Sequence, residues 1–362
     1  MQDVGWLLPI AGGLAGIVIG AAARRDRFCT LAALERYWYA NDSSGLRTWI
    51  LAATVALIAT QAMALTGMID LQRTFYLSPN FGWTGAILGG LAFGFGMALV
   101  GTCGFGALVR LGGGSLRSLV VLLVLGLSAL AAQRGLIAQG RVEIVDNLAA
   151  DLSFAGDQSL GSIASALLGF DARLAVACLV AGLLLLWIFS SADYRHRLGN
   201  IVTGGIIGLG VAFGWLATTW IAQRAFEPVQ IEAGSFVVPV GDTLVQFIAF
   251  TGVLPDYGVG LVVGVALGAA LVAWRKHDVR WEACDDAREL GRHIVGAFLM
   301  GTGGVFAMGC TIGQGVTAAS TLAISAPLVM LSIAIGARLG LAYLLEGSIW
   351  SVFRITHHES AE

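Results

Sequence analysis

The feature that most constrains this chain is the spacing of its charged residues, which leaves long apolar runs between them. Nine runs are long enough to cross about 30 Å of hydrocarbon at about 1.5 Å per helical residue. They cover residues 6–23, 48–69, 81–100, 116–138, 172–190, 199–222, 257–275, 293–309 and 325–346. Only 12% of the 362 residues are charged, against about 25% in soluble domains. The pattern predicts an all-α polytopic membrane protein. It excludes a soluble globule, a disordered chain and an outer-membrane barrel, whose strands alternate in polarity.

Lys and Arg residues divide the connections between these runs into two alternating sets. Fifteen lie in one set: Arg24, Arg25, Arg27, Arg36, Arg47, Arg110, Arg117, Arg195, Arg197, Arg275, Lys276, Arg280, Arg288, Arg292 and Arg354. Five lie in the other set: Arg73, Arg134, Arg141, Arg173 and Arg224. Because basic residues favour the cytoplasmic side, the count predicts an external N-terminus and a cytoplasmic C-terminus. The net charge of −2 gives no indication of a nucleic-acid partner, so the expected partner is the lipid bilayer.

Two segments, 89–118 and 296–325, resemble each other in sequence. Six positions are identical without gaps: Gly89/Gly296, Gly94/Gly301, Gly96/Gly303, Cys103/Cys310, Gly106/Gly313 and Ser118/Ser325. The charge count gives the runs before the two cysteines opposite directions, which predicts an inverted repeat, an architecture common among transporters and channels. Within one transmembrane domain over 1–362 we expect a first repeat at 1–140, a connector at 141–198 and a second repeat at 199–362. The alternative is a chance similarity between glycine-rich runs.

Two longer external connections are not plain loops. Residues 142–170 carry apolar residues at near-helical spacing. Residues 225–256 contain Gly241-Asp242-Thr243 before an apolar stretch, so Asp242 is predicted to cap a short helix. That helix is too short to span, and it either lies at the membrane interface or enters the membrane as a half-helix.

Three of the five cysteines share a setting at the end of an apolar run and just before a short helix-like stretch: Cys29, Cys103 and Cys310. Cys103 and Cys310 are also bracketed by glycines, which permit a broken helix. A cysteine at the N-terminus of a half-helix lies beside free backbone N–H groups and the positive end of the helix dipole. This is an anion site, and the soft, weakly donating thiol favours a sulfur-bearing anion over a hard one such as phosphate.

Irregular backbone at membrane depth is tolerated only where it is buried in protein or lines a pathway, so these loops are expected to line a conducting route. Beside the cysteines, Gly104, Thr311 and Gly313 are candidates to hold anionic oxygens. The remaining cysteines, Cys178 and Cys284, are interpreted as inert.

Four further polar residues are candidates for contact with a substrate. Arg110 follows Cys103 by seven residues and either attracts an anion or extends to the cytoplasmic surface. Arg338 lies within the last run, where we expect it to face protein or the route rather than lipid. Gln61 and Gln314 either donate hydrogen bonds to a substrate oxygen or join neighbouring helices. No acidic residue within the runs stands out as a proton or sodium site, which favours facilitated movement.

Other site chemistries have little support in the sequence. The chain has no CxxC pair, and its five histidines lie in or beside the predicted cytoplasmic segments, so neither a metal nor another cofactor is expected. No His or carboxylate lies near Cys103 or Cys310 in the sequence to act as a base for nucleophilic catalysis. The odd number of scattered cysteines does not form a disulfide framework. We therefore expect a protein that is not an enzyme.

With these motifs in view, the chain resembles the YeeE/YedE family of bacterial inner-membrane proteins, whose characterised members import thiosulfate. The resemblance rests on Arg-Phe-Cys at 27–29, on Gly-x-Cys-x-x-Gly at 101–106 followed by Arg110, and on Gly-Cys-Thr-Ile-Gly at 309–313. It extends over essentially the whole chain in the number of runs and in the order of the motifs.

The resemblance implies a nine-span, hourglass-shaped fold with two pseudo-symmetric halves. It assigns Cys29, Cys103 and Cys310 to a relay that passes thiosulfate along by S–H···S hydrogen bonds. It also implies location in a bacterial inner membrane and a small cytoplasmic TusA-like sulfur-carrier protein as a partner. The alternatives are a membrane-embedded sulfurtransferase or redox protein that forms a Cys persulfide, a transporter of another sulfur or selenium species, and a structural membrane subunit.

Overall fold

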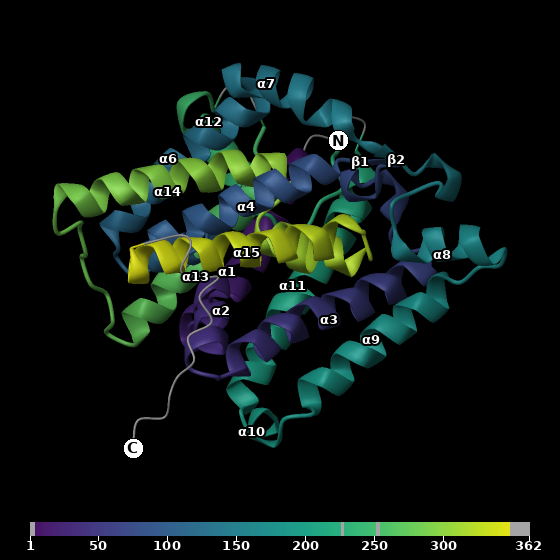
Figure 1. Ribbon diagram of the computed structural model, residues 1–362, viewed down its shortest axis with the longest axis horizontal. Helices are drawn as coiled ribbons and strands as arrows, with labels where there is room; N and C mark the ends of the chain where they lie inside the picture. Colours follow the sequence, from purple (N-terminus) through teal and green to yellow (C-terminus); the bar gives the residue numbers. More distant parts are fainter. Residues whose placement is uncertain (1–3, 226–227, 251–253, 348–362) are drawn as a thin grey trace.

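The computed structural model describes residues 4–225, 228–250 and 254–347, and these residues are almost entirely helical (Figure 1). The helices are α1 (Val4–Asp26), α2 (Thr30–Tyr39), α3 (Ser44–Leu65), α4 (Trp83–Val100), α5 (Gly104–Gly112), α6 (Leu116–Arg134), α7 (Leu136–Ile144), α8 (Leu160–Leu168), α9 (Arg173–Phe189), α10 (Ala192–Arg195), α11 (Leu198–Ala222), α12 (Val238–Ile248), α13 (Tyr257–Arg275), α14 (Ala287–Phe306) and α15 (Ser325–Glu346). Short 3-10 turns cover Leu71–Arg73, Phe75–Leu77, Asp146–Leu148 and Ser153–Ala155, and Gly313–Ala318 is π-helical. The strands β1 (Asn80–Phe81) and β2 (Ala150–Asp151) form one antiparallel pair with Asn80 opposite Asp151.

Each of the nine apolar runs lies mostly within one helix, and the described residues are almost entirely helical, which confirms the predicted all-α polytopic membrane fold. Within the described residues, seven helical segments are long and apolar enough to cross a membrane. The other two runs correspond to α9, which has only 17 residues, and α14, which begins with charged residues. The number of crossings therefore stays a prediction.

The long helices lie side by side, and the short elements gather at their two ends (Figure 1). One end holds α10 and the connection from α13 to α14, and the other holds α7, α8 and the β1–β2 pair. Helix α4 packs against both α14 and α15, while α1 packs against α13 and α3 against α11. The residues predicted to be cytoplasmic thus lie together: Arg24 pairs with Asp278 at 3.0 Å, and Lys276 donates to the Arg25 carbonyl at 3.2 Å. Arg354 lies outside the described residues.

Glycines set the closest of these contacts, between α1 and α13. Gly12, Gly16 and Gly20 on α1 face carbonyls of α13, and a Cβ on any of them would lie 2.1–2.4 Å from an oxygen. On α13, a Cβ at Gly264 would lie 2.3 Å from the Gly13 oxygen. Only glycine lets the two backbones approach so closely, which is the packing role expected of small residues in membrane helices.

Helices break immediately before each of the three singled-out cysteines. The residue two positions before the cysteine has a positive φ in every case: Arg27 (54°), Gly101 (78°) and Met308 (56°). Gly309 adds a second positive φ of 157° before Cys310. A left-handed residue ends one helix and turns the chain, so the cysteine begins the next helix.

Asp242 does not cap α12, so that prediction was wrong. The N-cap position is held by Val237, and Pro239 occupies the first turn of the helix. Proline suits the first turn because it lacks an N–H and its φ is already helical, so α12 starts one turn earlier than Asp242. The Asp242 carboxylate instead lies 3.7 Å from the Arg134 guanidinium at the end of α6.

Candidate functional site

The three cysteines each stand at the N-terminus of a short helical segment, as the sequence predicts. Cys29 is the N-cap of α2 and Cys103 is the N-cap of α5. The Cys103 sulfur accepts from the Gly106 N–H at 3.5 Å, and the Cys310 sulfur accepts from the Gly313 N–H at 3.4 Å. Two of the three thiols are therefore held among free backbone donors at the positive end of a helix.

The cysteines come together although they are distant in sequence. The Cys103 thiol interacts electrostatically with both Cys29 and Cys310, and it also faces the Thr311 side chain. The Cys29 sulfur lies 4.0 Å from the hydroxyl oxygen of Thr102. Cys103 and Cys310 are 1% and 0% exposed, whereas Cys29 is only partly buried. Cys103 is thus the middle member of the group.

An inner cavity of about 440 Å³ opens beside Cys29, on the side predicted to be cytoplasmic. Besides Cys29, its lining includes Thr102 and Gly106. Six arginines also line it: Arg24, Arg27, Arg36, Arg110, Arg117 and Arg280. Asp278 and Glu282 are the acidic residues of the lining, so this inner cavity is strongly basic.

An outer cavity of about 310 Å³ lies on the opposite side, near Cys310. Ser235, Met308 and Gly309 line it, together with Glu232 from the connection between α11 and α12. Cys103 and Cys310 do not line the inner or the outer cavity. The two most buried thiols therefore lie between the cavities.

Aromatic rings occupy the space around the buried thiols. The ring centroids of Phe105 and Phe236 are 4.9 Å apart, and those of Phe28 and Phe105 are 6.3 Å apart. Phe105 and Phe236 are each 1% exposed. Phe28 and Phe105 each adjoin or closely follow one of the cysteines in sequence, and the Phe236 N–H faces the Cys310 sulfur, so the three rings pack around the cysteine group.

The immediate neighbours of Cys310 are hydrogen-bond donors. The N–H groups of Phe236, Ile312 and Gly313 face its sulfur. The hydroxyls of Tyr76 and Ser235 lie next to Gly313, where a Cβ would be 3.3 Å and 3.2 Å from them. A ring of neutral donors around a thiol can hold an anion without an ion pair.

Both predicted glutamines already have partners within the protein. The Gln61 amide donates to the Ser320 carbonyl at 3.0 Å. The Gln314 amide donates to the Ala307 carbonyl at 2.8 Å and accepts from the Ser325 hydroxyl at 3.3 Å. These bonds agree with the alternative that the two glutamines join neighbouring parts of the protein. Contact of either glutamine with a substrate stays a prediction.

The two arginines singled out from the sequence have different surroundings. Arg110 donates to the Gly101 carbonyl at 2.9 Å and lines the inner cavity. Arg338 faces protein, as expected, because its guanidinium lies 4.6 Å from the Tyr39 ring centroid and 5.6 Å from that of Trp38. Gly104 begins α5, and a Cβ there would lie 3.2 Å from the Phe236 oxygen.

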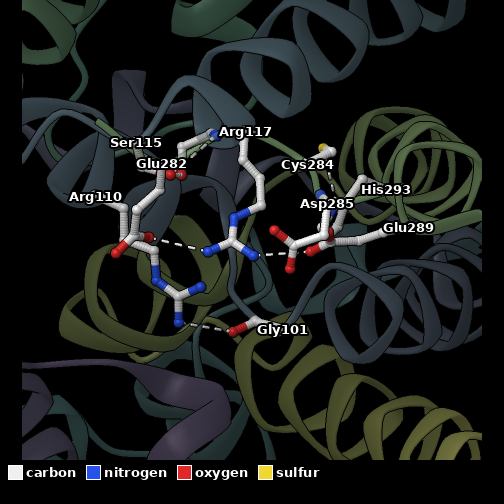
Figure 2. A network of polar contacts seen from close by, with 10 residues as sticks. Gly101, Arg110, Ser115, Arg117, Glu282, Cys284, Asp285, Glu289 and His293 are labelled. Atoms are coloured by element: carbon white, nitrogen blue, oxygen red, sulfur yellow. Dashed lines mark hydrogen bonds and ion pairs between the residues drawn. The ribbon is translucent and has the colours of Figure 1, made fainter. Parts of the chain in front are cut away.

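The remaining cysteines lie away from this group. Cys178 is exposed on α9, and Cys284 places its sulfur 3.8 Å from Nδ1 of His293 in a network next to the inner cavity (Figure 2). In the same network Arg117 pairs with Glu282 at 3.0 Å and with Glu289 at 2.8 Å. Arg117 thereby joins the start of α6 to the α13–α14 connection, through Glu282, and to the first turn of α14, through Glu289.

Substitution of Arg117 by Met is expected to loosen the 276–286 segment. Both ion pairs of the network would be lost, so the segment would open locally more often. Limited trypsin digestion of the purified protein measures this opening, and cleavage after Arg280 should become severalfold faster. The control is Arg288→Met at an exposed position of α14. Equal cleavage rates in the two variants would show that Arg117 does not hold the segment.

Comparison with known proteins places the chain in a family. Residues 25–339, most of the chain, match the family model described as sulphur transport. The chain belongs to the sulphur transport family. This confirms the resemblance to the YeeE/YedE proteins. Two relatives named thiosulfate transporter TsuA are similar to this chain. The Escherichia coli protein is 25% identical over 323 residues, and the match covers 84% of this chain and 86% of the relative. The Spirochaeta thermophila protein is 24% identical over 324 residues, covering 87% and 92%.

Several residues that lie around the cysteines or in the outer cavity of this sulphur transport family member were not predicted from the sequence. Thr102 adjoins Cys103 and was within reach of the motif. Phe105, Phe236 and Tyr76 come from segments that nothing in the linear pattern pairs with a cysteine. Glu232 lies in an irregular connection whose depth in the fold depends on packing against α11 and α13.

Proposed function

We propose that this protein transports thiosulfate, or a closely related small sulfur anion, inward across a bacterial inner membrane. The observation that carries the proposal is the convergence of Cys29, Cys103 and Cys310 between the basic inner cavity and the outer cavity. Membership of the sulphur transport family supports it, as do the names of the two relatives.

In this proposal the thiols act as a relay of hydrogen bonds. An anion entering the outer cavity would meet Ser235 and Gly309 and then the donors around Cys310. It would pass to Cys103, whose sulfur lies near both other cysteines, and leave beside Cys29 into the inner cavity. Each thiol offers a weak S–H donor and a polarizable surface, while Gly104, Thr311 and Gly313 offer backbone N–H groups. Arginines of the inner cavity would attract the emerging anion.

No covalent step is part of this mechanism, so we propose that the protein is not an enzyme. Among the described residues, the groups that interact with Cys103 and Cys310 are hydroxyls, N–H groups and other thiols. None of these is a base of the kind that activates a cysteine nucleophile. A small cytoplasmic TusA-like sulfur-carrier protein stays a predicted partner at the inner cavity.

We also propose that the chain is one transmembrane domain of two inverted repeats, 1–140 and 199–362, joined by a connector at 141–198. The support is a correspondence of packing partners. When α1, α3, α4 and α6 are paired with α11, α13, α14 and α15, the contact of α1 with α13 matches that of α3 with α11. The contact of α4 with α15 likewise matches that of α6 with α14. Helix α5 on α6 matches Gly313–Ala318 on α15.

The proposed orientation places the N-terminus outside and the C-terminus in the cytoplasm. It is supported by the gathering of the more basic set of connections around the inner cavity. The outer cavity, by contrast, has only Arg134 and Arg141 as basic residues in its lining.

Uptake of radiolabelled thiosulfate into proteoliposomes of the purified protein tests the proposed function. Uptake above that of protein-free liposomes is expected, with competition by unlabelled thiosulfate and weaker competition by sulfate, sulfite and selenite. Sulfate lacks a sulfane sulfur and so offers the thiols no soft atom. Uptake equal to that of empty liposomes would refute the proposal, and stronger competition by sulfite or selenite would reassign the substrate.

A further inference from the structure

Three carboxylates face the outer cavity from three different elements. Glu232 comes from the connection before α12, Asp242 from α12 and Asp256 from the N-cap of α13. The Gly258 N–H donates to Glu232 Oε1 at 3.3 Å, and the Val259 N–H donates to Asp256 Oδ1 at 2.8 Å. The cavity through which an anion would enter is therefore acidic.

The basic groups of the outer cavity compensate this charge only in part. Arg134 lies 3.7 Å from Asp242. Arg141 is paired with Asp146 at 3.2 Å and also donates to the Ala132 carbonyl. Neither ion pair that is described for these arginines involves Glu232 or Asp256. Arg134 also interacts electrostatically with Asp256, so its single charge is shared between two carboxylates. A dianion arriving here would therefore still meet net negative charge if all three carboxyls were ionised.

Glu232 lies closest to the route of the three. Glu232 interacts electrostatically with the Tyr76 side chain. Tyr76 in turn interacts with Cys310 and forms a hydrogen bond with the Ser235 side chain. The backbone oxygen of Glu232 accepts from Thr218 at 2.9 Å, which holds the connection against α11. Glu232 thus stands between the outer cavity and the donors around Cys310.

A second observation points to a polar occupant at this position. The Tyr257 side chain is 1% exposed, and its hydroxyl has no hydrogen-bond partner among the described residues. A Cβ built on Gly214 would lie 2.7 Å from that hydroxyl and 2.9 Å from the Ala233 Cα, so the hydroxyl lies beside the residue next to Glu232. Buried polar atoms are rarely left without a partner, and a bound water would supply one.

The environment of Glu232 favours its neutral form. Burial, together with the negative charges of Asp256 and Asp242, raises the pKa of the Glu232 carboxyl to about 8, although the hydrogen bond from the Gly258 N–H opposes this rise. The group is therefore protonated below about pH 8 and ionised above it.

We propose that Glu232 binds a proton that enters together with the anion, so that transport by this protein is coupled to proton movement. The proposal rests on the proposed function. Protonation of Glu232 removes one negative charge from the outer cavity before the anion arrives, and the proton is released on the inner side together with the anion. The driving force of a proton gradient would then add to that of the anion gradient.

The test uses proteoliposomes that contain a trapped pH-sensitive dye and receive radiolabelled thiosulfate outside. With the unaltered protein, uptake should be accompanied by internal acidification. Uptake should also fall about tenfold as the external pH rises from about 7 to about 9, because the protonated fraction of Glu232 falls tenfold. Glu232→Gln mimics the neutral carboxyl, so its uptake should lose this pH dependence and the acidification. The matched control is Glu143→Gln on α7, which removes an exposed carboxylate at the same end of the protein.

The outcomes separate this inference from the proposed function. No thiosulfate uptake at any pH by the unaltered protein would refute the function itself. Uptake without acidification by the unaltered protein would overturn the proton site alone, and this arm needs no variant. A Glu232→Gln protein that keeps the original pH profile and acidification would also overturn it. Glu232→Asp, which keeps a titratable group, should restore acidification if Glu232→Gln folds poorly.

Discussion

Replacing either buried thiol, in Cys103→Ala or Cys310→Ala, should lower thiosulfate uptake by about 10- to 100-fold. A hydrogen bond to a charged group contributes about 1.5–3 kcal/mol, and each variant removes one donor from the proposed relay. Neither substitution adds volume, so both proteins should still insert into the membrane. Growth of a host that depends on thiosulfate as its sulfur source, together with labelled uptake, measures the effect.

The matched control for these variants is Cys178→Ala. Its thiol is exposed on α9, away from the cysteine group, so uptake should equal that of the unaltered protein. Full uptake by both Cys103→Ala and Cys310→Ala at normal expression would rule out a relay through the thiols.

Substitution of Gly264 by Leu should prevent stable packing of α1 on α13. Even an Ala Cβ would lie 2.3 Å from the Gly13 oxygen, so the helices must separate along the whole ladder of glycines. Overpacking of this kind costs about 1–3 kcal/mol for small insertions, and a leucine should exceed that range. Gly264→Ala should lower the Tm of the purified protein by several degrees, and Gly264→Leu should abolish the folded peak in size-exclusion chromatography.

Gly182→Ala on α9 provides the comparison for the glycine variants. Nothing lies within 4 Å of a Cβ at this position, and alanine is a better helix former than glycine. Its Tm should be equal to or slightly above that of the unaltered protein. A Gly264→Ala protein with the same Tm as Gly182→Ala would mean that the α1–α13 contact tolerates separation.

The long-range charge and hydropathy pattern was enough to predict the helices. Every apolar run became a helix because burial in lipid requires each backbone group to bond within its own segment. The break before Cys103 was also predictable, because Gly101 permits the positive φ that the chain needs there. Before Cys310 the glycine signal is only partial, since Gly309 supplies one positive φ while Met308 adopts another without being a glycine. The break before Cys29 has no such signal, since Arg27 adopts the same left-handed conformation without a glycine.

The contents of the site depended on packing that the linear sequence does not encode locally. The start of α12 was misplaced because a proline two residues into the helix outweighed an aspartate that resembles a cap. The contact of Phe236 with Phe105 joins segments more than a hundred residues apart. The position of Glu232 beside the outer cavity was not predictable, because it lies outside the apolar runs and its place in the fold depends on hydrogen bonds from Thr218 and Gly258.

Intact passage of thiosulfate through unmodified thiols is the central claim, and one measurement tests it most directly. Proteoliposomes are given thiosulfate with different sulfur isotopes at its two positions, and the internal anion and the intact mass of the protein are both determined by mass spectrometry. The account predicts internal thiosulfate that carries both labels in one molecule and a protein of unchanged mass. Internal sulfite, with a stable gain of one sulfur on Cys103 or Cys310, would contradict it and identify a sulfurtransferase.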